Sequence, residues 1–190
     1  MPTRPLILAS ASPRRHHLLR EAGHDFDVVV SAVEERHDHA LSPEDLTIHN
    51  ALCKACDISA RHPEACVLGA DTLVYLDGEP LGKPADHREA AAMLRRLAGR
   101  EHAVCTGIGL AIGGREVARA AVISHVRFGP LDDDAITRYH TLVDPLDKAG
   151  AYGIQQHFDM LGASVDGPHD NVMGLPVGEV NRLLREWTVY

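Results

Sequence analysis

The fold is first visible in the stretch Leu6-Ile-Leu-Ala-Ser-Ala-Ser-Pro-Arg-Arg15, where an apolar run gives way to the start of a helix. The run from Leu6 to Ala9 is typical of a short buried strand. Ser12-Pro13 supplies a helix-capping side chain and a proline that fits the first helical turn, and Gly23 ends the helix near Ala22. The segment therefore predicts a strand, a turn and a helix in direct succession.

Strand and helix patterns continue to alternate along the chain. Ser42-Pro43-Glu44-Asp45 predicts the start of a long helix that runs to about Arg61, and Asp77-Gly78 and Gly113-Gly114 predict hairpin turns. The predicted strands are Leu6–Ala9, Phe26–Val30, Ala65–Gly69, Val74–Leu76, Pro80–Leu81, His102–Ile112, Glu116–Phe128, Gly150–Ile154 and Met160–Val165. The further predicted helices run from Asp86 to Gly99, from Leu131 to Leu142 and from Val177 to Trp187. This order favours an α/β fold with a mixed sheet and flanking helices.

The composition is that of an ordinary globular protein, because 45% of the 190 residues are hydrophobic and 24% are charged. This length allows one sizeable core, so we expect a single domain over residues 1–190. No run of eighteen apolar residues occurs, and the short run at Leu6 to Ala9 leaves no room for a signal peptide. We therefore expect a soluble protein of the cytoplasm that does not enter a membrane.

Acidic residues outnumber basic ones, with 27 Asp and Glu against 19 Lys and Arg and a formal net charge of −8. A chain of net negative charge repels polyanions and lacks the basic surface of a DNA-binding or RNA-binding protein. We expect no nucleic-acid partner, and any site for phosphate must be a local gathering of basic side chains.

Four cysteines in a chain of this length do not form the framework of a disulfide-rich protein, which favours free thiols in a reducing compartment. Cys53 and Cys56 form a CxxC pair, but the pair falls within a predicted helix, and Cys66 and Cys105 stand apart. A redox or zinc site would need a strand-to-helix context or a second ligand pair. The 13 histidines are scattered, and His37-Asp38-His39 has metal-binding side chains in what is more simply a solvated loop.

Two arginines, Arg14 and Arg15, stand in the first turn of the helix that follows the first strand. The positive end of the helix dipole makes each cation unfavourable there by about 0.3–1 kcal/mol unless an anion binds. A phosphate reverses the sign of this interaction, since backbone N–H groups, the Ser10 and Ser12 hydroxyls and both guanidinium groups converge on it. The segment predicts a polyanion site, and the alternative is an ordinary helix start with solvated arginines.

Gly69-Ala-Asp-Thr72 places a carboxylate and a hydroxyl at the end of the predicted strand Ala65–Gly69. Ligands of open α/β sheets bind at the ends of strands, so Asp71 is a candidate catalytic residue. An aspartate with an ordinary pKa, near 3.9, is a weak base. Beside a divalent cation, however, its carboxylate can ligate the metal or orient a water molecule. The alternative role for such an aspartate is a helix or turn cap.

Two lysines and one glutamine complete the candidate residues. Lys83, in Gly82-Lys-Pro84, is predicted in an extended loop because of the proline that follows it. Lys54 lies on the long helix off its apolar stripe, and the alternative is a surface charge paired with Asp57. Gln155 follows a glycine-rich, strand-like segment and has an amide suited to reading the edge of a base, or is simply a polar strand residue.

Motifs of other phosphate-handling and hydrolytic families are missing from the sequence. Neither GxxxxGK[ST] nor GxGxxG occurs, which argues against P-loop and Rossmann nucleotide sites. No GxSxG nucleophile elbow occurs either. The remaining interpretation is phosphate chemistry that depends on a metal ion and on positioning of the substrate.

Taken together, these segments resemble the Maf family of nucleotide pyrophosphatases, also called septum formation inhibitors. The resemblance spans nearly the whole chain. It rests, in chain order, on Leu6–Arg15, Val33-Glu-Glu35, Lys54-Ala55, Gly69-Ala-Asp-Thr72, Asp77-Gly78 with Gly82-Lys-Pro84, Asp147-Lys-Ala-Gly-Ala-Tyr-Gly-Ile-Gln155 and Asn171-Val-Met-Gly-Leu-Pro176. A single short motif is a weak indication, but this many motifs in a fixed order are specific.

The resemblance implies a fold and an activity. The fold is an elongated, two-lobed α/β domain of the Maf and ITPase type, with a central cleft in which the nucleotide binds. The activity is hydrolysis of a nucleoside triphosphate to the monophosphate and pyrophosphate, in a house-cleaning role for the nucleotide pool. The resemblance also implies a divalent cation, Mg2+ or Mn2+, and a homodimer.

The resemblance also implies which residues form the site. The family's acid or base aspartate falls on Asp71, and the metal ion would bind Asp71 and Glu35. The phosphate-contacting and structuring positions are Ser10, Arg14, Arg15, Glu35, Lys54 and Lys83. The positions that divide the family by substrate are Arg14, Thr72 and Gln155, which resemble the branch acting on dTTP and UTP rather than the branch acting on 7-methyl-GTP.

The sequence departs from the family pattern at Gln156, where glycine is usual, and at Pro168-His169-Asp170. These departures bear on fine specificity or on the dimer contact, and not on catalysis. Two alternatives from other classes stay open. One is a nucleotide-binding regulator of cell division without important catalysis, and the other is a thiol or metal-binding protein that uses Cys53, Cys56 and the histidines.

Overall fold

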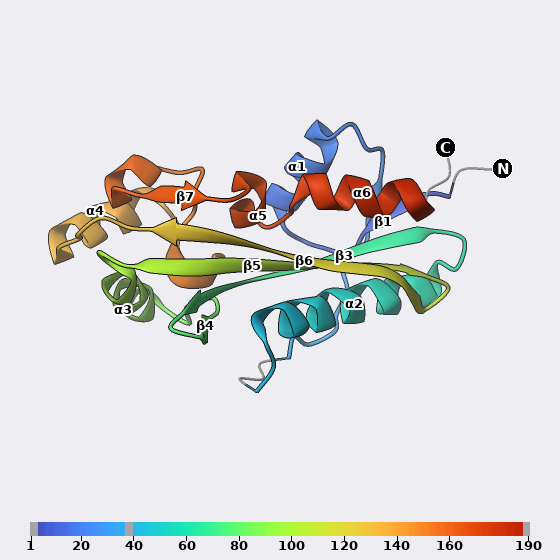
Figure 1. Cartoon of the computed structure of the whole chain (residues 1–190), viewed down its shortest axis with the longest axis horizontal. Coiled ribbons are helices and arrows are strands. Elements are labelled where there is room, and N and C mark those ends of the chain that lie inside the picture. Colours follow the sequence, from blue (N-terminus) through green and yellow to red (C-terminus); the bar gives the residue numbers. More distant parts are fainter. Residues whose placement is uncertain (1–3, 37–39, 188–190) are drawn as a thin grey trace. The chain divides into compact units, whose positions relative to one another are not determined.

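The computed structural model describes residues 4–36 and 40–187, and Figure 1 shows their helices and strands. The predicted His37-Asp38-His39 loop lies outside the described residues. Within those residues the strands form one seven-stranded sheet in the order β2-β1-β3-β5-β6-β7, with β4 paired to β3. The sheet contains parallel and antiparallel pairs, so the predicted α/β fold with a mixed sheet and flanking helices is confirmed.

The described residues form seven strands, six α-helices and two short 3-10 helices. The strands are β1 (Leu6–Leu8), β2 (Asp27–Val28), β3 (Cys66–Leu76), β4 (Glu79–Leu81), β5 (Glu101–Ile112), β6 (Arg115–Arg127) and β7 (Ser164–Asp166). The helices are α1 (Pro13–Glu21), α2 (Pro43–Arg61), α3 (His87–Leu97), α4 (Asp133–Leu142), α5 (His169–Met173) and α6 (Val177–Trp187), with short 3-10 helices η1 (Ala149–Ala151) and η2 (Phe158–Leu161). Of the helices in the described residues, none has the length and apolar character needed to cross a membrane.

These elements divide between two compact units, each with an apolar core. The first unit contains the described residues of 1–72, 106–122 and 174–190, and the second contains residues 73–105 and 123–173. Strands β3, β5 and β6 contribute residues to both units. The single domain expected over residues 1–190 stays a prediction.

The first unit is organised by the alternating faces of its parallel strands. β1 pairs in parallel with both β2 and β3, with Ile7 opposite Val67. Ile7 and Val67 share one buried cluster with Ala55 and Ile58 of α2. Because successive side chains of a strand point to opposite faces, the neighbours of Ile7 and Val67 point away from α2. Figure 1 shows α2 on one face of these strands and α1 and α6 on the other.

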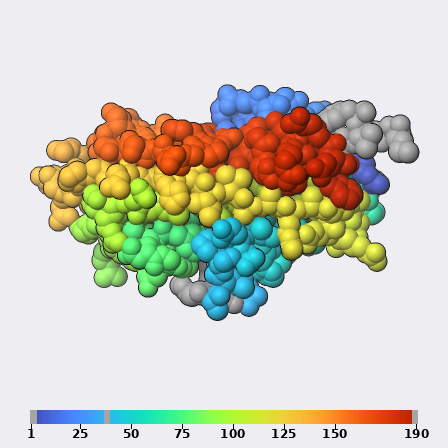
Figure 2. Space-filling view, viewed as in Figure 1, coloured from blue at the N-terminus to red at the C-terminus, as the bar shows by residue number. Residues whose placement is uncertain are grey.

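Helices α1 and α6 share the second face of the first unit. Figure 2 shows α6 in red beside the blue segment that contains α1. His24, which follows α1, and Asn181, on α6, lie with Nε2 and Oδ1 2.6 Å apart. The predicted bounds of α6, Val177 to Trp187, are confirmed.

Side-chain caps fix the helix starts that the sequence predicted. Ser42 Oγ accepts a hydrogen bond from Asp45 N at 3.1 Å at the start of α2, and Asp86 caps α3 in the same way. Each bond satisfies a backbone N–H that has no partner within its own helix. α1 differs, because in the described structure Ser12 makes no side-chain capping bond and its N–H donates to Ser10 Oγ.

Both predicted hairpin turns are confirmed. Asp77 and Gly78 have φ angles of 53° and 83° between β3 and β4, and Gly113 and Gly114 have φ angles of 56° and 78° between β5 and β6. Two consecutive residues with positive φ form the two-residue turn whose twist matches that of paired strands. Glycine and aspartate adopt this backbone more readily than most residues, which is why the sequence signal was reliable.

Helix α2 lies very close to the sheet because glycines occupy the strand positions beneath it. A Cβ atom added to Gly69 of β3 would lie 2.0 Å from the carbonyl oxygen of Ala51. A Cβ atom added to Gly107 of β5 would lie 2.3 Å from the backbone N of Ile48. Both obstacles are backbone atoms of α2, which cannot rotate out of the way as a side chain does. The close approach therefore depends on the lack of a side chain at these two positions.

We predict that Gly69→Ala lowers the free energy of unfolding by about 3 kcal/mol or prevents folding, because α2 must move away from β3. Gly178→Ala is the matched control, since a Cβ atom there meets nothing within 4 Å and the position lies in the first turn of α6. The control should be neutral or stabilising by up to about 1 kcal/mol. Denaturant unfolding followed by circular dichroism compares the two, and equal stabilities would contradict this account.

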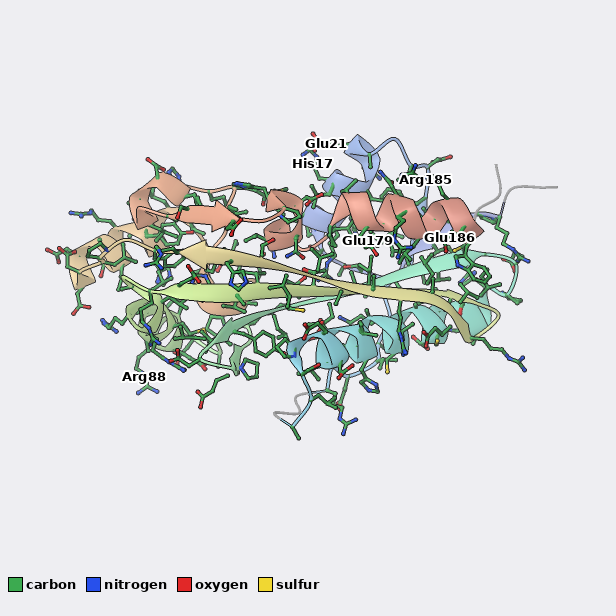
Figure 3. All side chains as sticks on the ribbon, in the orientation of Figure 1. His17, Glu21, Arg88, Glu179, Arg185 and Glu186 are labelled. Atoms are coloured by element: carbon green, nitrogen blue, oxygen red, sulfur yellow. The ribbon has the colours of Figure 1, made fainter. Side chains whose placement is uncertain are left out.

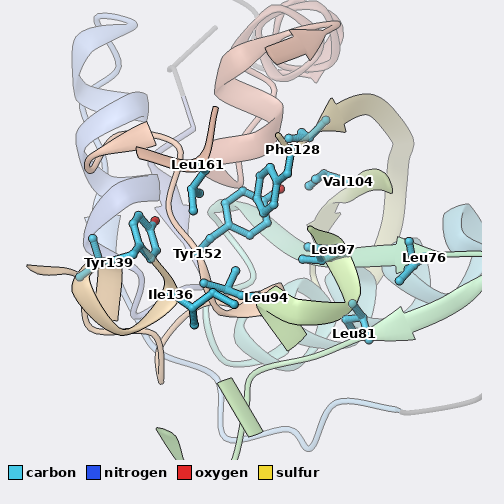
Figure 4. Packing of buried hydrophobic residues seen from close by; sticks show 13 residues of the cluster. Leu76, Leu81, Leu94, Leu97, Val104, Phe128, Ile136, Tyr139, Tyr152 and Leu161 are labelled. Atoms are coloured by element: carbon cyan, nitrogen blue, oxygen red, sulfur yellow. The ribbon is translucent and has the colours of Figure 1, made fainter. Parts of the chain in front are cut away.

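The second unit has an apolar core around Phe128 and Tyr152 (Figure 4). The rings of these two residues meet edge to face, with centroids 4.9 Å apart. Such a pair contributes about 0.5–1.5 kcal/mol beyond the burial of its area. The other buried members of the core are Val74, Leu76, Leu81, Leu94, Leu97, Val104, Val126, Ile136, Tyr139, Val143 and Leu161.

A buried histidine, His102, packs against this aromatic pair. Its ring centroid lies 4.8 Å from that of Phe128 and 5.4 Å from that of Tyr152. Its Nε2 lies 2.8 Å from the Tyr152 hydroxyl, whereas its Nδ1 has no hydrogen-bond partner among the described residues. Burial disfavours the charged imidazolium and lowers the pKa of His102 from 6.5 to about 4. His102 is therefore neutral at neutral pH.

We predict that His102 makes the protein less stable as the pH falls from 6.5 to about 4, because only the unfolded chain takes up a proton on this ring in that range. The full stabilisation is present above the unfolded pKa, and about 3 kcal/mol is lost across the window. His102→Gln should remove this part of the pH dependence, whereas His17→Gln, at a histidine 61% exposed, should not. Urea unfolding at about pH 7.5 and pH 5 measures the difference. An unchanged pH dependence in His102→Gln would show that the histidine is not the cause.

Several predicted strands differ in extent from the structure. β3 runs to Leu76 as one strand, so the separately predicted Ala65–Gly69 and Val74–Leu76 join through Asp71. The strand predicted at Phe26–Val30 shrinks to the two residues of β2. The strand predicted at Met160–Val165 divides into η2 and the short β7, and the sequence did not predict α5.

The predicted strand Gly150–Ile154 is wrong. Gly150 and Ala151 have positive φ angles of 70° and 64°, and the 3-10 helix η1 begins the segment instead. Both backbone groups of Gly153 bond to the hydroxyl of Tyr139. The hydroxyl accepts a hydrogen bond from Gly153 N at 3.0 Å and donates one to the carbonyl of Gly153 at 3.4 Å. A hydroxyl from α4 thus takes the place of a neighbouring strand, which the local sequence does not reveal.

Candidate functional site

Asp71 lies in the middle of β3 and is buried, with 4% of its surface exposed. The prediction that it follows the end of a strand is wrong, because β3 continues to Leu76. Asp71 shares a face of β3 with Gly69, two residues earlier, so its carboxylate points towards α2. The close approach of α2 at Gly69 therefore brings helix side chains within reach of a carboxylate that has little access to water.

Lys54 of α2 binds this carboxylate. Its Nζ donates to Asp71 Oδ1 at 3.1 Å and to Glu35 Oε1 at 2.7 Å. It also donates to the carbonyl of Ala70 at 3.3 Å, so all three N–H donors of the ammonium are used. The structure thus brings together Lys54, Glu35 and Asp71, three of the predicted site residues.

The alternative in which Lys54 pairs with Asp57 is wrong. Asp57 Oδ2 instead accepts hydrogen bonds from Arg61 Nη2 and Ser31 Oγ, each at 2.7 Å. Asp57 is near Lys54 in sequence, but the buried Asp71 attracts an ammonium more strongly because less water screens the charges. The alternative interpretation of Lys54 as a surface charge is also wrong, since its side chain is 12% exposed.

Ion pairs on outer helix surfaces show how different this pair is. Arg182 and Glu186 of α6 lie 3.3 Å apart with side chains 52% and 59% exposed, and Figure 3 labels Glu186. Exposed pairs of this kind contribute about 0–1 kcal/mol. The side chains of Lys54 and Asp71 are 12% and 6% exposed, and removing one partner of a buried pair costs about 3–5 kcal/mol. This part of the sheet therefore depends on both partners.

Asn50 is a residue of this cluster that the sequence pattern did not bring to notice. It lies four residues before Lys54 on α2 and is 3% exposed. Its Nδ2 donates to Asp71 Oδ2 at 3.0 Å, so each oxygen of this carboxylate has a partner from α2. The signal that would have found Asn50 is this spacing, which places both side chains on one face of the helix.

Arg15 and Thr72 lie on the opposite face of β3. Arg15 Nη1 donates to the carbonyl of Ala70 at 3.0 Å, and Nη2 donates to Thr72 Oγ1 at 3.0 Å. Arg15 Nε donates to the carbonyl of Gly174 at 2.8 Å, and Nη1 also donates to Ser10 Oγ at 3.3 Å. Arg15 therefore ties the start of α1 to β3 and to the segment before α6.

The Thr72 hydroxyl has a second fixed neighbour. Its Oγ1 lies 2.9 Å from Thr106 Oγ1 of β5, and Thr106 is fully buried. Because Arg15 donates to the same oxygen, the Thr72 hydroxyl is held from two directions. Its position is set by β3, β5 and α1 together.

The charges of this cluster act on one another. Burial lowers the pKa of Arg15 below its ordinary value, whereas the carboxylates of Asp71 and Glu35 oppose the shift and the cation of Arg14 adds to it. Arginine still keeps its charge at neutral pH. With Lys54, the first unit thus gathers three of the predicted basic residues and both predicted carboxylates.

Lys83 and Gln155 belong to the second unit. Both are exposed, Lys83 in the loop after β4 and Gln155 in a turn after η1. A hydrogen bond from Gly150 N to the carbonyl of Gly82, at 3.1 Å, joins the two loops. The structure therefore places these two predicted residues on connected loops, and their placement relative to Asp71 stays a prediction.

The positions that depart from the family pattern also lie in the second unit. Gln156 N donates to the carbonyl of Gly153 at 3.2 Å, within the turn that holds Gln155. The carbonyl of Pro168 accepts from Ser124 Oγ at 2.9 Å, and α5 begins at His169. One departure therefore lies in a turn, and the other lies at the start of α5.

No group of three or more His, Cys, Asp or Glu side chains that could hold a metal ion occurs in the described part of the chain. Mg2+ commonly binds through one or two carboxylates, with substrate phosphates and waters completing its shell. Asp71 and Glu35 fit that pattern, because both accept from Lys54 Nζ and carboxylate oxygens keep further lone pairs. These donors suit a hard divalent cation that is shared with a phosphate.

The four cysteines are free thiols. Burial raises the pKa of Cys56, and it raises the pKa of Cys66 to about 11. Reactive and metal-binding cysteines show the opposite shift, towards the thiolate. Cys53 Sγ lies 3.6 Å from His49 Nε2, a single contact on the exposed side of α2. The geometry therefore favours structural cysteines over the thiol or metal-binding alternative.

The fold has relatives among solved structures. A HAM1 protein from Coxiella burnetii matches with a TM-score of 0.56 and 14% identity, over 96% of this chain and 99% of that one. The Ham1 protein of Staphylococcus aureus matches with a TM-score of 0.56 and 15% identity, over 97% of this chain and 100% of that one. At this identity the likeness shows a shared α/β fold.

Sequence comparison places the chain more narrowly. A sequence model of the family described as Maf-like protein matches residues 5–187, so the chain belongs to the Maf family. The chain is similar to the dTTP/UTP pyrophosphatase of Akkermansia muciniphila, with 46% identity over 182 residues and 95% of each chain covered. It is also similar to the dTTP/UTP pyrophosphatase of Symbiobacterium thermophilum, with 50% identity over 183 residues, 96% of this chain and 93% of that protein. The resemblance inferred from the motifs is confirmed.

We predict that Arg15→Lys lowers the free energy of unfolding by about 2–4 kcal/mol, because one ammonium cannot replace the separate hydrogen bonds that the guanidinium makes. Arg20→Lys is the control on the same helix, where the side chain is exposed. It should change the free energy of unfolding by less than about 0.5 kcal/mol. Urea unfolding compares the two variants, and equal effects would show that Arg15 is not a structural tie.

Proposed function

We propose that this chain hydrolyses dTTP and UTP to the nucleoside monophosphates and pyrophosphate. The observation that carries the proposal is the buried carboxylate of Asp71, bound by Lys54 and Asn50. It occurs in a Maf-family chain whose relatives at 46% and 50% identity are dTTP/UTP pyrophosphatases. The chain is then a hydrolase of the α–β phosphoanhydride with a house-cleaning role in the nucleotide pool.

In this proposal Asp71 orients the attacking water. Each of its carboxylate oxygens accepts one hydrogen bond from α2 and keeps a lone pair for the water. The oxygen of the water forms a bond to the α-phosphorus as the bond from that phosphorus to the α–β bridging oxygen breaks, and pyrophosphate leaves. Asp71 accepts the proton that the attacking water gives up. Asp71 and Glu35 would hold Mg2+ or Mn2+, and the cation would supply positive charge that stabilises the phosphates.

The basic residues position the triphosphate. Transfer at phosphorus depends mainly on positioning and on stabilising negative charge, so cations fixed before the substrate arrives are effective. Lys54 and Arg15 are fixed in this way by hydrogen bonds to the protein. The residues that we assign to phosphate binding are Ser10, Arg14, Arg15, Lys54 and Lys83.

We assign recognition of the base to Arg14, Thr72 and Gln155. The Thr72 hydroxyl supports this, because Arg15 and Thr106 hold it in one position before a base arrives. The amide of Gln155 offers a donor and an acceptor that suit the edge of a pyrimidine. From the resemblance to the Maf family we also propose a homodimer in the cytoplasm.

We predict that the protein releases pyrophosphate rather than orthophosphate from dTTP and UTP when Mg2+ or Mn2+ is present, and that a chelator stops the reaction because the phosphates lose their counter-charge. Ion chromatography separates the two products. A panel that adds dCTP, GTP and 7-methyl-GTP tests the choice of base. Nucleotide binding without pyrophosphate release would instead favour a nucleotide-binding regulator of cell division.

The same assay tests Asp71 directly. Asp71→Asn should still fold, with a lower free energy of unfolding, because Lys54 loses one charged partner but keeps Glu35. It should lower kcat for dTTP by about 10²–10⁴-fold, because an amide cannot accept the proton of the attacking water. Asp57→Asn is the matched control, since Asp57 is an ion-paired aspartate of α2 that does not contact Asp71 in the described hydrogen bonds. A parental rate in Asp71→Asn would reject the assignment.

A further inference from the structure

Asn50 makes three hydrogen bonds with its side-chain amide. Its Oδ1 accepts from Arg36 N at 2.8 Å, and its Nδ2 donates to the carbonyl of Arg36 at 3.1 Å. The second donor of Nδ2 reaches Asp71 Oδ2 at 3.0 Å. Asn50 therefore joins the residue after Glu35 to the carboxylate of Asp71, and it does so from a position that is 3% exposed.

The partners fix which way round the amide lies. If the amide were reversed, its oxygen would face the carbonyl of Arg36 and the carboxylate of Asp71, and its NH2 group would face the N–H of Arg36. Those contacts are repulsive, so the partners leave one orientation of the amide. The side chain of Asn50 has no freedom to follow a rotating carboxylate.

A structural role alone gives a poor account of asparagine at this position. Asn50 lies inside α2, where asparagine is less favourable for a helix than leucine or alanine. Other buried residues of the same helix, Ala51, Ala55 and Ile58, are apolar. The polar side chain is best explained by the groups it contacts, which are the Asp71 carboxylate and the backbone next to Glu35.

We propose that Asn50 is a positioning residue that sets the orientation of the Asp71 carboxylate and holds the Glu35 segment beside Lys54. Asn50 fixes Asp71 Oδ2, whereas Lys54 contacts Asp71 Oδ1 and Glu35 Oε1. The carboxylate is thus held at both oxygens, and the backbone at Arg36 is held by the same amide. This inference rests on the proposed function, because it gives Asp71 the role of orienting the attacking water.

Two variants separate the contacts of Asn50. Asn50→Asp keeps the shape and an acceptor for Arg36 N, but it loses both donors and turns an oxygen towards Asp71. Asn50→Leu has the same branching and the same number of side-chain heavy atoms and favours the helix, but it loses all three hydrogen bonds. Ser59→Ala is the matched control, because Ser59 is a fully buried residue of α2 whose Oγ accepts from Gly114 N at 3.0 Å, away from Asp71.

We predict that both Asn50 variants lower kcat for dTTP by about 10²-fold, because a small displacement of the orienting carboxylate misaligns the attacking water. The KM should change by less than about threefold, since the assigned phosphate and base contacts remain. Ser59→Ala should keep the parental kcat and KM while it unfolds at lower denaturant. This separation of kcat from KM distinguishes positioning from a general loss of stability.

A second measurement is independent of activity. Hydrogen exchange of the Arg36 amide, followed by NMR, should be slow in the parent and in Asn50→Asp, which keeps an acceptor, and fast in Asn50→Leu. If Asn50→Asp does not fold, Asn50→Leu supplies both measurements. Fast exchange of this amide in the parent would overturn the proposed contact with the Glu35 segment.

The outcomes keep the two proposals apart. A parent that releases no pyrophosphate contradicts the proposed function, and the Arg36 exchange still tests the contact. An active parent with a folded Asn50 variant of parental kcat overturns the role of Asn50 and leaves the proposed function in place. A loss confined to KM overturns it as well, because an orienting residue acts on the chemical step.

Discussion

The arrangement around Asp71 depends on how closely α2 lies against β3. Gly69 and Gly107 leave room for the helix backbone where any side chain would collide with it. The short side chain of Asn50 reaches Asp71 only because of this approach, and Lys54 then has a carboxylate, rather than water, as its partner. Packing and charge pairing are therefore one constraint in this unit, since a helix held further away would leave a buried carboxylate without partners.

Local signals predicted most of the fold. The capping residues Ser42 and Asp86 and the paired turn residues at 77–78 and 113–114 act over a few residues, so a sequence pattern records them directly. Gly150–Ile154 was misassigned because the backbone groups of Gly153 bond to the hydroxyl of Tyr139, which lies on another element, and Gly150 N bonds to the carbonyl of Gly82. The end of β3 was misplaced for a similar reason. An aspartate interrupts the apolar run, and only partners from α2 make its burial in a strand favourable.

The sequence predicted which residues belong to the charged cluster, but not which residues bond to one another within it. Arg15, Lys54 and Asp71 were identified correctly as members of one local gathering of charge, but the partners of Lys54 were not. A pairing between neighbours on one helix is visible in the sequence, whereas the contact between Lys54 and Asp71, which are 17 positions apart, is not. Asn50 was missed because an amide is a weak signal until its neighbours are known. Its importance comes from geometry and not from its chemical type.

Asp71 and Thr72 are adjacent in the chain but leave β3 on opposite faces, one towards Lys54 and the other towards Arg15. Lys54 and Arg15 still share one acceptor, the carbonyl of Ala70, which links the two faces. Inserting or deleting one residue between Gly69 and Asp71 would exchange the faces, because side chains alternate along a strand. A carboxylate would then be removed from Lys54 and placed with Arg15. We therefore expect this part of β3 to tolerate the replacement of single residues better than a change in its length.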